Sequence, residues 1–349
     1  MTLIKYIVRK VLVMFLIFVT SMTIFFFFFR VAPVALGGGN PLAPAKAAFD
    51  PLLASVGSAI QGNPSAATWV GYTSSLYALN RPLIPDQLIA FYKNIFTFNF
   101  GRSLYTQRPV EIEILIRLPY TLSIYVVGVL LPIVVGYYLA LYAIKYRGRI
   151  LDLIITVSSL ISYTVPPYVL LLIIYYFLAY LPKVRFGIGI FPLPVRAPII
   201  SPATTVEELF YLTWYVIPIY ISLVLTSFGQ WAYYIRQLVV SEAEKDYVVS
   251  ARARGLEEKI IIRREMIPNV RPPLMTALAY SIPTVFGGSV VLEMLTSWPG
   301  VASYAYQALS VGDFPAIIAF YTISVALIII SLLLTDILIA IIDPRTRLT

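Results

Sequence analysis

The sequence predicts an all-α integral membrane protein with about six transmembrane helices. Of its 349 residues, 59% are hydrophobic and only 12% are charged, and the mean hydropathy is +0.84. A soluble domain of this length needs a far more polar surface. Six long apolar segments also run through the chain, each close to the roughly 20 residues that one membrane-spanning helix requires. These observations indicate that lipid surrounds most of the chain.

The six predicted spans are continuous apolar runs, as expected for helices in a bilayer. Lipid offers the backbone no hydrogen-bond partners, so only helices and closed barrels can span it. Barrel strands alternate in polarity over about ten residues, and these runs do not alternate. They cover approximately residues 11–32, 118–144, 153–181, 210–232, 274–293 and 316–342.

The first span has two interpretations. Lys5, Arg9 and Lys10 precede its apolar core, as they would in a cleaved signal peptide. The apolar run from Val11 to Phe29 is longer than an ordinary signal-peptide core, so we expect a retained anchor.

Prolines inside the later spans are expected to kink them without ending them. Proline breaks soluble helices, but neighbouring helices in a membrane bundle can satisfy the freed carbonyls. The prolines concerned are Pro132, Pro166, Pro167, Pro218 and Pro283.

The distribution of basic residues predicts that both termini lie in the cytoplasm. Cytoplasmic connections are enriched in Lys and Arg. One side holds 16 of the 26 basic residues, in residues 1–10, 145–152, 233–273 and 343–349. The outer side then receives residues 33–117, 182–209 and 294–315, and the last of these has no Lys or Arg.

We therefore divide the chain into three parts: the N-terminal segment with the first helix, 1–32; an extracellular loop region, 33–117; and a core with five spans, 118–349, which includes the cytoplasmic loop 233–273. The loop region begins with Ala-, Gly- and Pro-rich sequence that cannot form a core alone. Further along, residues 86–96 place Leu88, Ile89, Tyr92 and Ile95 at helical spacing, which predicts an amphipathic helix on the outer surface.

Several kinds of chemistry are excluded by composition. The chain has no Cys and no His, so thiolate nucleophiles, imidazole bases and His/Cys metal sites are absent. It contains no Gly-Lys pair, so it lacks the phosphate-binding loop of P-loop ATPases. The net charge of +9 could suggest nucleic acid, but the sorting of Lys and Arg by the membrane explains it, and no nucleic-acid partner is expected.

The segment from Ser241 to Asn269 predicts a cytoplasmic helical hairpin. Ser241 and Glu244 form a capping-box pattern, Gly255 can take the left-handed position that ends a helix, and Pro268 would limit the second helix. Ala251 shares a face with Gly255 and Val248, which would offer a shallow docking surface to another protein. The alternative is an interfacial helix whose arginines lie near anionic headgroups: Arg252, Arg254, Arg263 and Arg264.

The letters DYVVSARARGL, followed by Pro268 and Asn269, resemble the cytoplasmic signature of ATP-binding-cassette importer permeases. The two alanines and the glycine of that signature correspond to Ala251, Ala253 and Gly255. The resemblance implies a type I importer permease fold, in which this loop forms a coupling helix that sits in a groove of the ATPase subunit. The coupling residues that it implies are Asp246, Ala251, Ala253, Gly255, Leu256 and Pro268.

Further segments resemble the B-type subunit of dipeptide and oligopeptide permeases. They include IVRKVLVMFLIFV near the N-terminus, FGRSLYTQRPV at 100–110, LPYTLSI at 118–124, GGSVVLEMLTSWPGVASYAYQAL at 287–309 and DILIAIIDPRTR at 336–347. The resemblance covers about residues 1–30 and 95–347. The chain departs from the family in the outer loop, where a short Gly-Asp-Pro stretch is usual and APVALGGGNPLAPAKAAFD stands instead.

The resemblance also implies the partners. A second, similar permease, two cytoplasmic ATPase subunits or domains and an extracellular binding protein would complete the importer, with ATP and Mg bound on the ATPase subunits only. Relatives carry peptides, oligosaccharides or nickel, and we favour peptides. The 26 tyrosines and 4 tryptophans suit sugar stacking and interfacial anchoring equally, so they do not decide the substrate.

Two acids in or beside apolar spans support an alternative. Glu293 and Asp336 could couple ions in a stand-alone secondary transporter or channel. Both fall where the permease pattern has acids, so we favour a structural role at helix ends. That alternative leaves the cytoplasmic hairpin unexplained, and an intramembrane enzyme is disfavoured because no His, Cys or paired-Asp motif is present.

Overall fold

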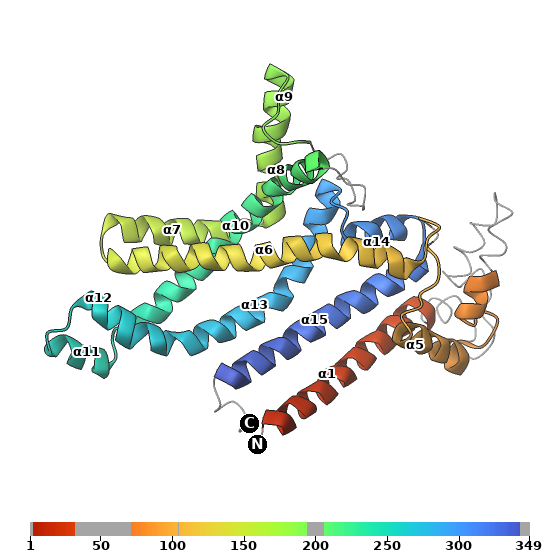
Figure 1. Cartoon of the computed structure of the whole chain (residues 1–349), viewed down its shortest axis with the longest axis horizontal. Coiled ribbons are helices and arrows are strands. Elements are labelled where there is room, and N and C mark those ends of the chain that lie inside the picture. Colours follow the sequence, from red (N-terminus) through yellow and green to blue (C-terminus); the bar gives the residue numbers. More distant parts are fainter. Residues whose placement is uncertain (1–2, 32–70, 104, 194–205, 343–349) are drawn as a thin grey trace. The chain divides into compact units, whose positions relative to one another are not determined.

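The computed structural model describes residues 3–31, 71–103, 105–193 and 206–342, and this part of the chain is almost entirely helical (Figure 1). The all-α fold class predicted from the sequence is confirmed. The Ala-, Gly- and Pro-rich start of the outer loop, for which no core was predicted, and the C-terminal residues 343–349 lie outside the described residues.

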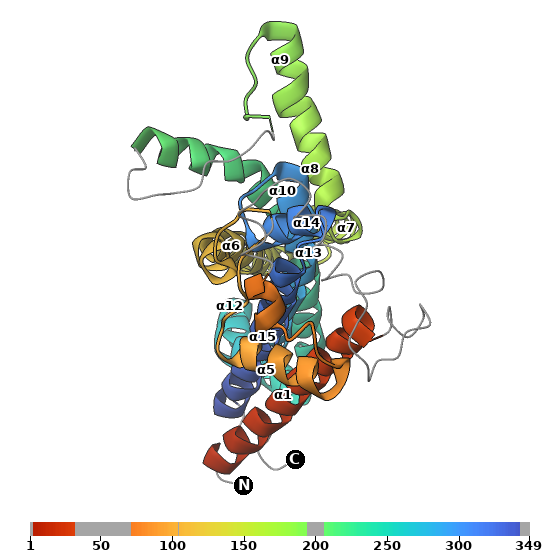
Figure 2. The ribbon, with the colours of Figure 1, turned by 90° about the vertical axis from the view of Figure 1, so that its right-hand side faces the viewer.

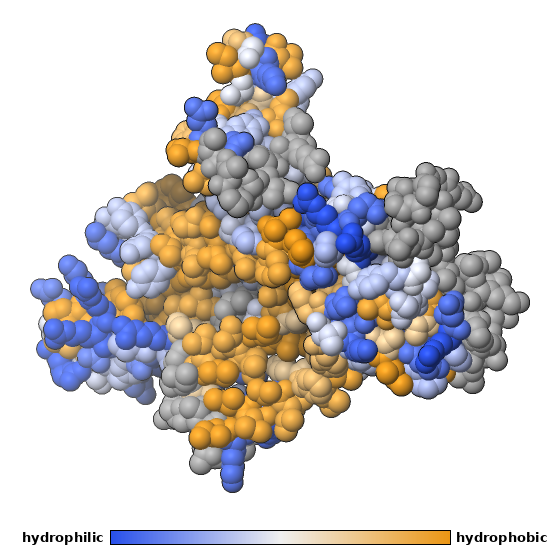
Figure 3. Space-filling model, turned by 45° about the vertical axis from the view of Figure 1, so that its right-hand side comes forward, coloured by the Kyte–Doolittle hydropathy of each residue, from blue (hydrophilic) through white to orange (hydrophobic). Residues whose placement is uncertain are grey.

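Five helical stretches in the described ranges are long and apolar enough to cross a membrane. They run over Ile4–Val31, Val110–Lys145, Pro167–Phe186, Val206–Glu242 and Phe314–Ala340. They contain α1 (Leu3–Phe26), α6 (Val110–Lys145), α8 (Pro167–Tyr175), α9 (Leu181–Phe186), α10 (Val206–Glu242) and α15 (Phe314–Ile342). Apolar side chains cover broad areas of the surface in Figure 3, as a bilayer requires.

The predicted span 153–181 is wrong as a single helix, because the chain breaks at Pro166. α7 (Ile150–Thr164) ends there, and α8 begins at Pro167. Val165 is extended, with φ −88° and ψ 120°, as residues before proline prefer. The expected kink is thus a complete break at Pro166, whereas α10 continues through Pro218. After the break, α8 and α9 form one continuous rod (Figures 1 and 2).

The predicted span 274–293 lies inside a longer helix, α13 (Ile267–Thr296). This helix has 30 residues, which is long enough to cross a membrane. α10 likewise extends ten residues beyond its predicted end at 232, into the predicted cytoplasmic loop. Much of that loop is therefore helical.

The helices fall into two compact units, one of residues 1–6, 122–298 and 331–349 and the other of residues 7–121 and 299–330. In the first unit, α10 is packed closely between two neighbours. A side chain at Gly229 of α10 would place its Cβ 2.1 Å from the Ser159 oxygen of α7, and one at Gly136 of α6 would lie 2.5 Å from Trp231 Cβ. Ser162 Oγ adds a hydrogen bond of 2.6 Å to Leu225 O. Backbones approach this closely only where side chains are small.

The second unit has an apolar core and a set of buried polar contacts. Met22, Phe25 and Phe26 of α1 pack against α5 (Leu88–Phe96), α14 (Val301–Ser310) and α15. Asp313, fully buried, accepts hydrogen bonds from Ser103 Oγ, from Tyr105 N at 3.1 Å and from Ala316 N at 3.3 Å. The last of these bonds caps the start of α15.

The amphipathic helix predicted within 86–96 is confirmed as α5, with a different buried face. Phe91, Asn94 and Ile95 are buried, while Ile89 is 63% exposed. The prediction placed Ile89 on the apolar face. The backbone over Leu83–Gln87, just before α5, is kinked, because Ile84 is extended with φ −126° and ψ 125°.

Candidate functional site: the cytoplasmic hairpin

The predicted hairpin is present and turns at Gly255. α11 (Asp246–Ala253) is followed by α12 (Glu258–Ile260), and Gly255 between them has φ +77°. Gly255 N donates to Arg252 O at 2.9 Å, and Leu256 N donates to Ala251 O at 3.4 Å. These two bonds form a Schellman motif, in which the residue after the helix takes the left-handed conformation that glycine favours.

Both predicted ends of the hairpin are wrong. Ser241 does not cap it, because α10 continues to Glu242 and Ser241 Oγ donates to Leu238 O, one turn back in that helix. Pro268 does not end the second helix, because the π-helical segment Ile261–Met266 before it runs directly into α13. The chain therefore remains helical from Glu258 through Thr296. The hairpin is continuous with a long helix on one side and is separated from α10 by a turn of three residues on the other.

The face that the sequence suggested for docking lies inside the chain. Val248 and Ala251 are fully buried in an apolar cluster built from α10, α11, the π-helical segment Ile261–Met266 and α13. Its other members are Val239, Ala243, Ile261, Met266 and Val270. Helical spacing correctly placed Val248 and Ala251 on one face, but the chain itself covers that face.

The free face of the hairpin is formed by other residues. Val249 is 55% exposed and Leu256 is 37% exposed, and Ala253 and Gly255 between them are also exposed. A side chain added at Gly255 would meet nothing within 4 Å. Val249, Ala253 and Leu256 thus present apolar side chains away from the rest of the chain.

The coupling residues implied by the resemblance therefore occupy four places. Ala253, Gly255 and Leu256 come together at the C-terminal end of α11. Asp246 lies in the first turn of α11, where the helix dipole stabilises its negative charge. Ala251 is internal, and Pro268 lies in α13.

An ion pair braces the turn. Arg252 donates from Nε to Glu258 Oε2 at 3.0 Å and from Nη2 to Glu258 Oε1 at 2.7 Å, and its Nη1 donates to Ala243 O at 3.2 Å. The hydrogen bonds from Arg252 hold the pKa of Glu258 below its ordinary value, and Arg147 lowers it further. Both side chains are about half exposed, so the pair contributes only about 1 kcal/mol or less.

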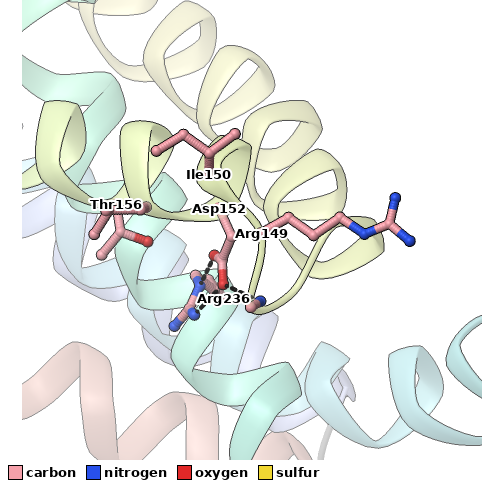
Figure 4. A pocket seen from close by; sticks show the side chains of 7 residues that line it. Arg149, Ile150, Asp152, Thr156 and Arg236 are labelled. Atoms are coloured by element: carbon pink, nitrogen blue, oxygen red, sulfur yellow. Dashed lines mark hydrogen bonds and ion pairs between the residues drawn. The ribbon is translucent and has the colours of Figure 1, made fainter.

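A groove of about 450 Å³ lies at the turn between α6 and α7, next to the first turns of α7 and to α10 (Figure 4). In it, Arg236 of α10 forms two hydrogen bonds to the carboxylate of Asp152, of 2.7 and 2.8 Å. Gly148 N donates to the same carboxylate at 3.1 Å. The positive charge of Arg236 therefore balances the negative charge of this buried carboxylate, and the pair holds the turn against α10.

The two intramembrane acids have different surroundings. Glu293 is fully buried in the last turn of α13, where its carbonyl accepts Trp298 N at 3.0 Å and Ser297 takes a left-handed conformation. Asp336 is half-buried within α15. The helix-end role proposed for Glu293 fits its position at the end of α13, whereas Asp336 is internal to its helix.

These observations describe a multi-pass helical membrane protein with a short helical hairpin between two long helices. Residues 128–348 match the family described as binding-protein-dependent transport system inner membrane component, and the chain belongs to that family. It is thus a permease subunit of an ATP-driven importer, without an ATPase site of its own. Members of the family work with a partner permease, ATPase subunits and a binding protein.

Individual relatives extend the match to the whole chain. The dipeptide transport system permease protein DppB of Lactococcus lactis is 26% identical over 346 residues, which cover 99% of this chain and 100% of the relative. The oligopeptide transport system permease protein AppB of Bacillus subtilis is 27% identical, covering 77% and 82%. A putative peptide permease protein of Brucella suis is 28% identical, covering 82% and 88%.

Proposed function

We propose that this permease carries peptides, and that it forms the translocation path together with a second, similar permease. The support is that each relative described above is named for dipeptides, oligopeptides or peptides. Uptake of a labelled dipeptide by cells with the intact importer, competed by unlabelled peptides, an oligosaccharide or nickel, tests the substrate class. Competition by the oligosaccharide or by nickel, without competition by peptides, would contradict this assignment.

The second part of the proposal is that the hairpin docks onto an ATPase subunit through its free face. The observation that carries it is the exposed group of Val249, Ala253, Gly255 and Leu256 on a helix whose other face is packed against α10 and α13. One ATPase subunit would bind this hairpin and a second would bind the partner permease. Asp246 and Pro268 would then shape the ends of the docking segment without forming its centre.

Gly255→Glu tests the docking, and Gly148→Glu is its matched control. Both glycines have nearly the same left-handed conformation, with φ +77° and +76°, and a side chain at either would meet nothing within 4 Å. Backbone strain of about 1–2 kcal/mol is therefore common to both variants. Only Gly255→Glu introduces a charge into the proposed contact, where burial without a partner is costly.

We expect both variants to accumulate in the membrane to similar levels. Gly255→Glu should lose co-purification of the ATPase subunits, or peptide uptake, or both, whereas Gly148→Glu should keep both. Normal uptake by Gly255→Glu would overturn the docking proposal. Equal losses in the two variants would also overturn it, because they would point to strain alone.

The proposed topology places both termini in the cytoplasm and the long connection 33–117 outside. It is supported by the distribution of Lys and Arg along the sequence. Because the chain has no cysteine, single-cysteine variants can report each side. We expect an impermeant thiol reagent outside intact cells to label Ile60→Cys but neither Thr2→Cys nor Leu348→Cys. Labelling of either terminal variant would contradict this topology, because it would place that terminus outside the cell.

A further inference from the structure

One tyrosine hydroxyl connects the coupling hairpin to both long helices that flank it. Tyr247 of α11 donates from its hydroxyl to Glu242 Oε1 at 2.6 Å, and Glu242 is the last residue of α10. The same hydroxyl accepts a hydrogen bond of 3.0 Å from Asn269 Nδ2, in the first turn of α13. Asn269 Nδ2 also donates to Glu265 O at 3.0 Å. Three helices thus meet at one oxygen atom.

Glu242 is a fixed acceptor in this arrangement. It is buried, and its second oxygen pairs with Lys245 Nζ at 2.6 Å. A buried carboxylate keeps its charge only with such partners, and hydrogen bonds to it are stronger than those between neutral groups. Burial and the neighbouring Glu242 raise the pKa of Tyr247, so its hydroxyl stays protonated and remains a donor.

The other contacts of α11 restrain it less specifically. Val248 and Ala251 pack into the apolar cluster, but apolar packing is non-directional and tolerates small sliding movements. The brace between Arg252 and Glu258 is half exposed, and it reaches only the turn after α10, at Ala243 O, and the start of the helical stretch that leads into α13. Of these described contacts, only those of Tyr247 join α11 by hydrogen bonds to the last residue of α10 and to the first turn of α13 itself.

We propose that Tyr247 is a positioning residue for coupling, whose hydroxyl makes α11 move together with α10 and α13. A displacement that an ATPase subunit imposes on α11 then reaches both long helices without being lost in the turns. This inference rests on the docking proposed above. It predicts that removing one oxygen atom leaves docking intact and weakens the transmission of movement.

Tyr247→Phe is the direct test, because it removes the hydroxyl and keeps the ring. The variant is assembled with its partner permease, ATPase subunits and binding protein in liposomes. ATP hydrolysis and peptide uptake are measured in the same preparation. Tyr142→Phe is the control, since Tyr142 is a half-exposed residue of α6 outside the hairpin.

We expect Tyr247→Phe to retain the ATPase subunits and to hydrolyse ATP, while uptake per ATP falls about fivefold, the equivalent of about 1 kcal/mol. Tyr142→Phe should behave as the parent. Asn269→Ala, which cuts the link to α13 only, should produce a smaller fall. The double variant should be no worse than Tyr247→Phe alone, because both changes break one connection.

Two outcomes would overturn the inference. One is an unchanged uptake per ATP in Tyr247→Phe, and the other is additive losses in the double variant, which a merely structural role predicts. If Tyr247→Phe accumulates poorly, Asn269→Ala is compared with the parent instead. An unchanged uptake per ATP in Asn269→Ala would then also overturn the proposal. Failure of the docking proposal is recognised separately, because then Gly255→Glu keeps normal uptake and its ATPase subunits.

Discussion

Gly229 and Gly255 lie in two regions of the same unit that depend on glycine for opposite reasons. At Gly229, the backbones of α10 and α7 are so close that no side chain fits, since a Cβ would lie 2.1 Å from Ser159 O. At Gly255 there is open space, and the requirement is the positive φ of +77°. The first region is constrained by neighbours and the second by its own backbone. Packing between long helices is therefore intolerant of added volume, whereas the hairpin is intolerant mainly of a changed backbone conformation.

The largest effect is expected from Gly229→Ala. The added methyl group overlaps backbone atoms that cannot rotate away, so α7 and α10 must separate, at a cost of about 1–3 kcal/mol or more. We expect a clear fall in membrane abundance and in the unfolding temperature of the purified subunit. Gly71→Ala is the control, because a Cβ there meets nothing within 4 Å. Parental stability of Gly229→Ala would mean that the two helices are not held this closely.

A smaller, local effect is expected from Gly255→Ala. A left-handed alanine costs about 1–2 kcal/mol, whereas asparagine adopts this conformation more readily. Abundance should stay normal, and amide hydrogen exchange should quicken in residues 252–258 in the order glycine, asparagine, alanine. Equal exchange rates in all three proteins would show that the backbone conformation at residue 255 does not limit the stability of this turn.

The smallest effect concerns the brace next to the turn. The pKa of Glu258 lies below its ordinary value of 4.5, so its pairing with Arg252 stabilises the folded hairpin at neutral pH. That contribution is lost only as the pH falls below the ordinary value and through the lowered one. We expect exchange protection of the hairpin to be constant from neutral pH to about pH 5, with any loss below that. In Glu258→Gln, the part of this acid-dependent loss that comes from the pair with Arg252 should disappear.

The sequence identified the features that depend on composition and on local pattern. Helical spans, the glycine turn and the amphipathic helix before α6 all follow from apolar runs, turn residues and spacing. The break at Pro166 could not be read from the prolines alone, because α13 stays helical through the equally adjacent Pro272 and Pro273.

Other features depend on which surfaces the folded chain covers, and a local pattern cannot report that. Val248 and Ala251 were correctly placed on one face, but only the fold shows that α10 and α13 bury it. Tyr247 carried no visible signal, because its partners Glu242 and Asn269 stand 5 and 22 residues away along the chain. Ser241 and Pro268 matched real capping rules at positions where neighbouring helical sequence overrode them.

The pair of Asp152 and Arg236 has a consequence for how the chain enters the membrane. Orientation is decided while segments insert, before α7 and α10 can pack, and Lys and Arg count in that decision whereas Asp and Glu contribute little. Arg236 therefore acts as a full positive charge during insertion and opposes its own translocation under the proposed topology. Once the helices pack, the Asp152 carboxylate accepts two hydrogen bonds from Arg236, and its negative charge balances the positive charge of the arginine. Arg236 thus first helps to orient the nascent chain and later joins α10 to α7 in the folded subunit.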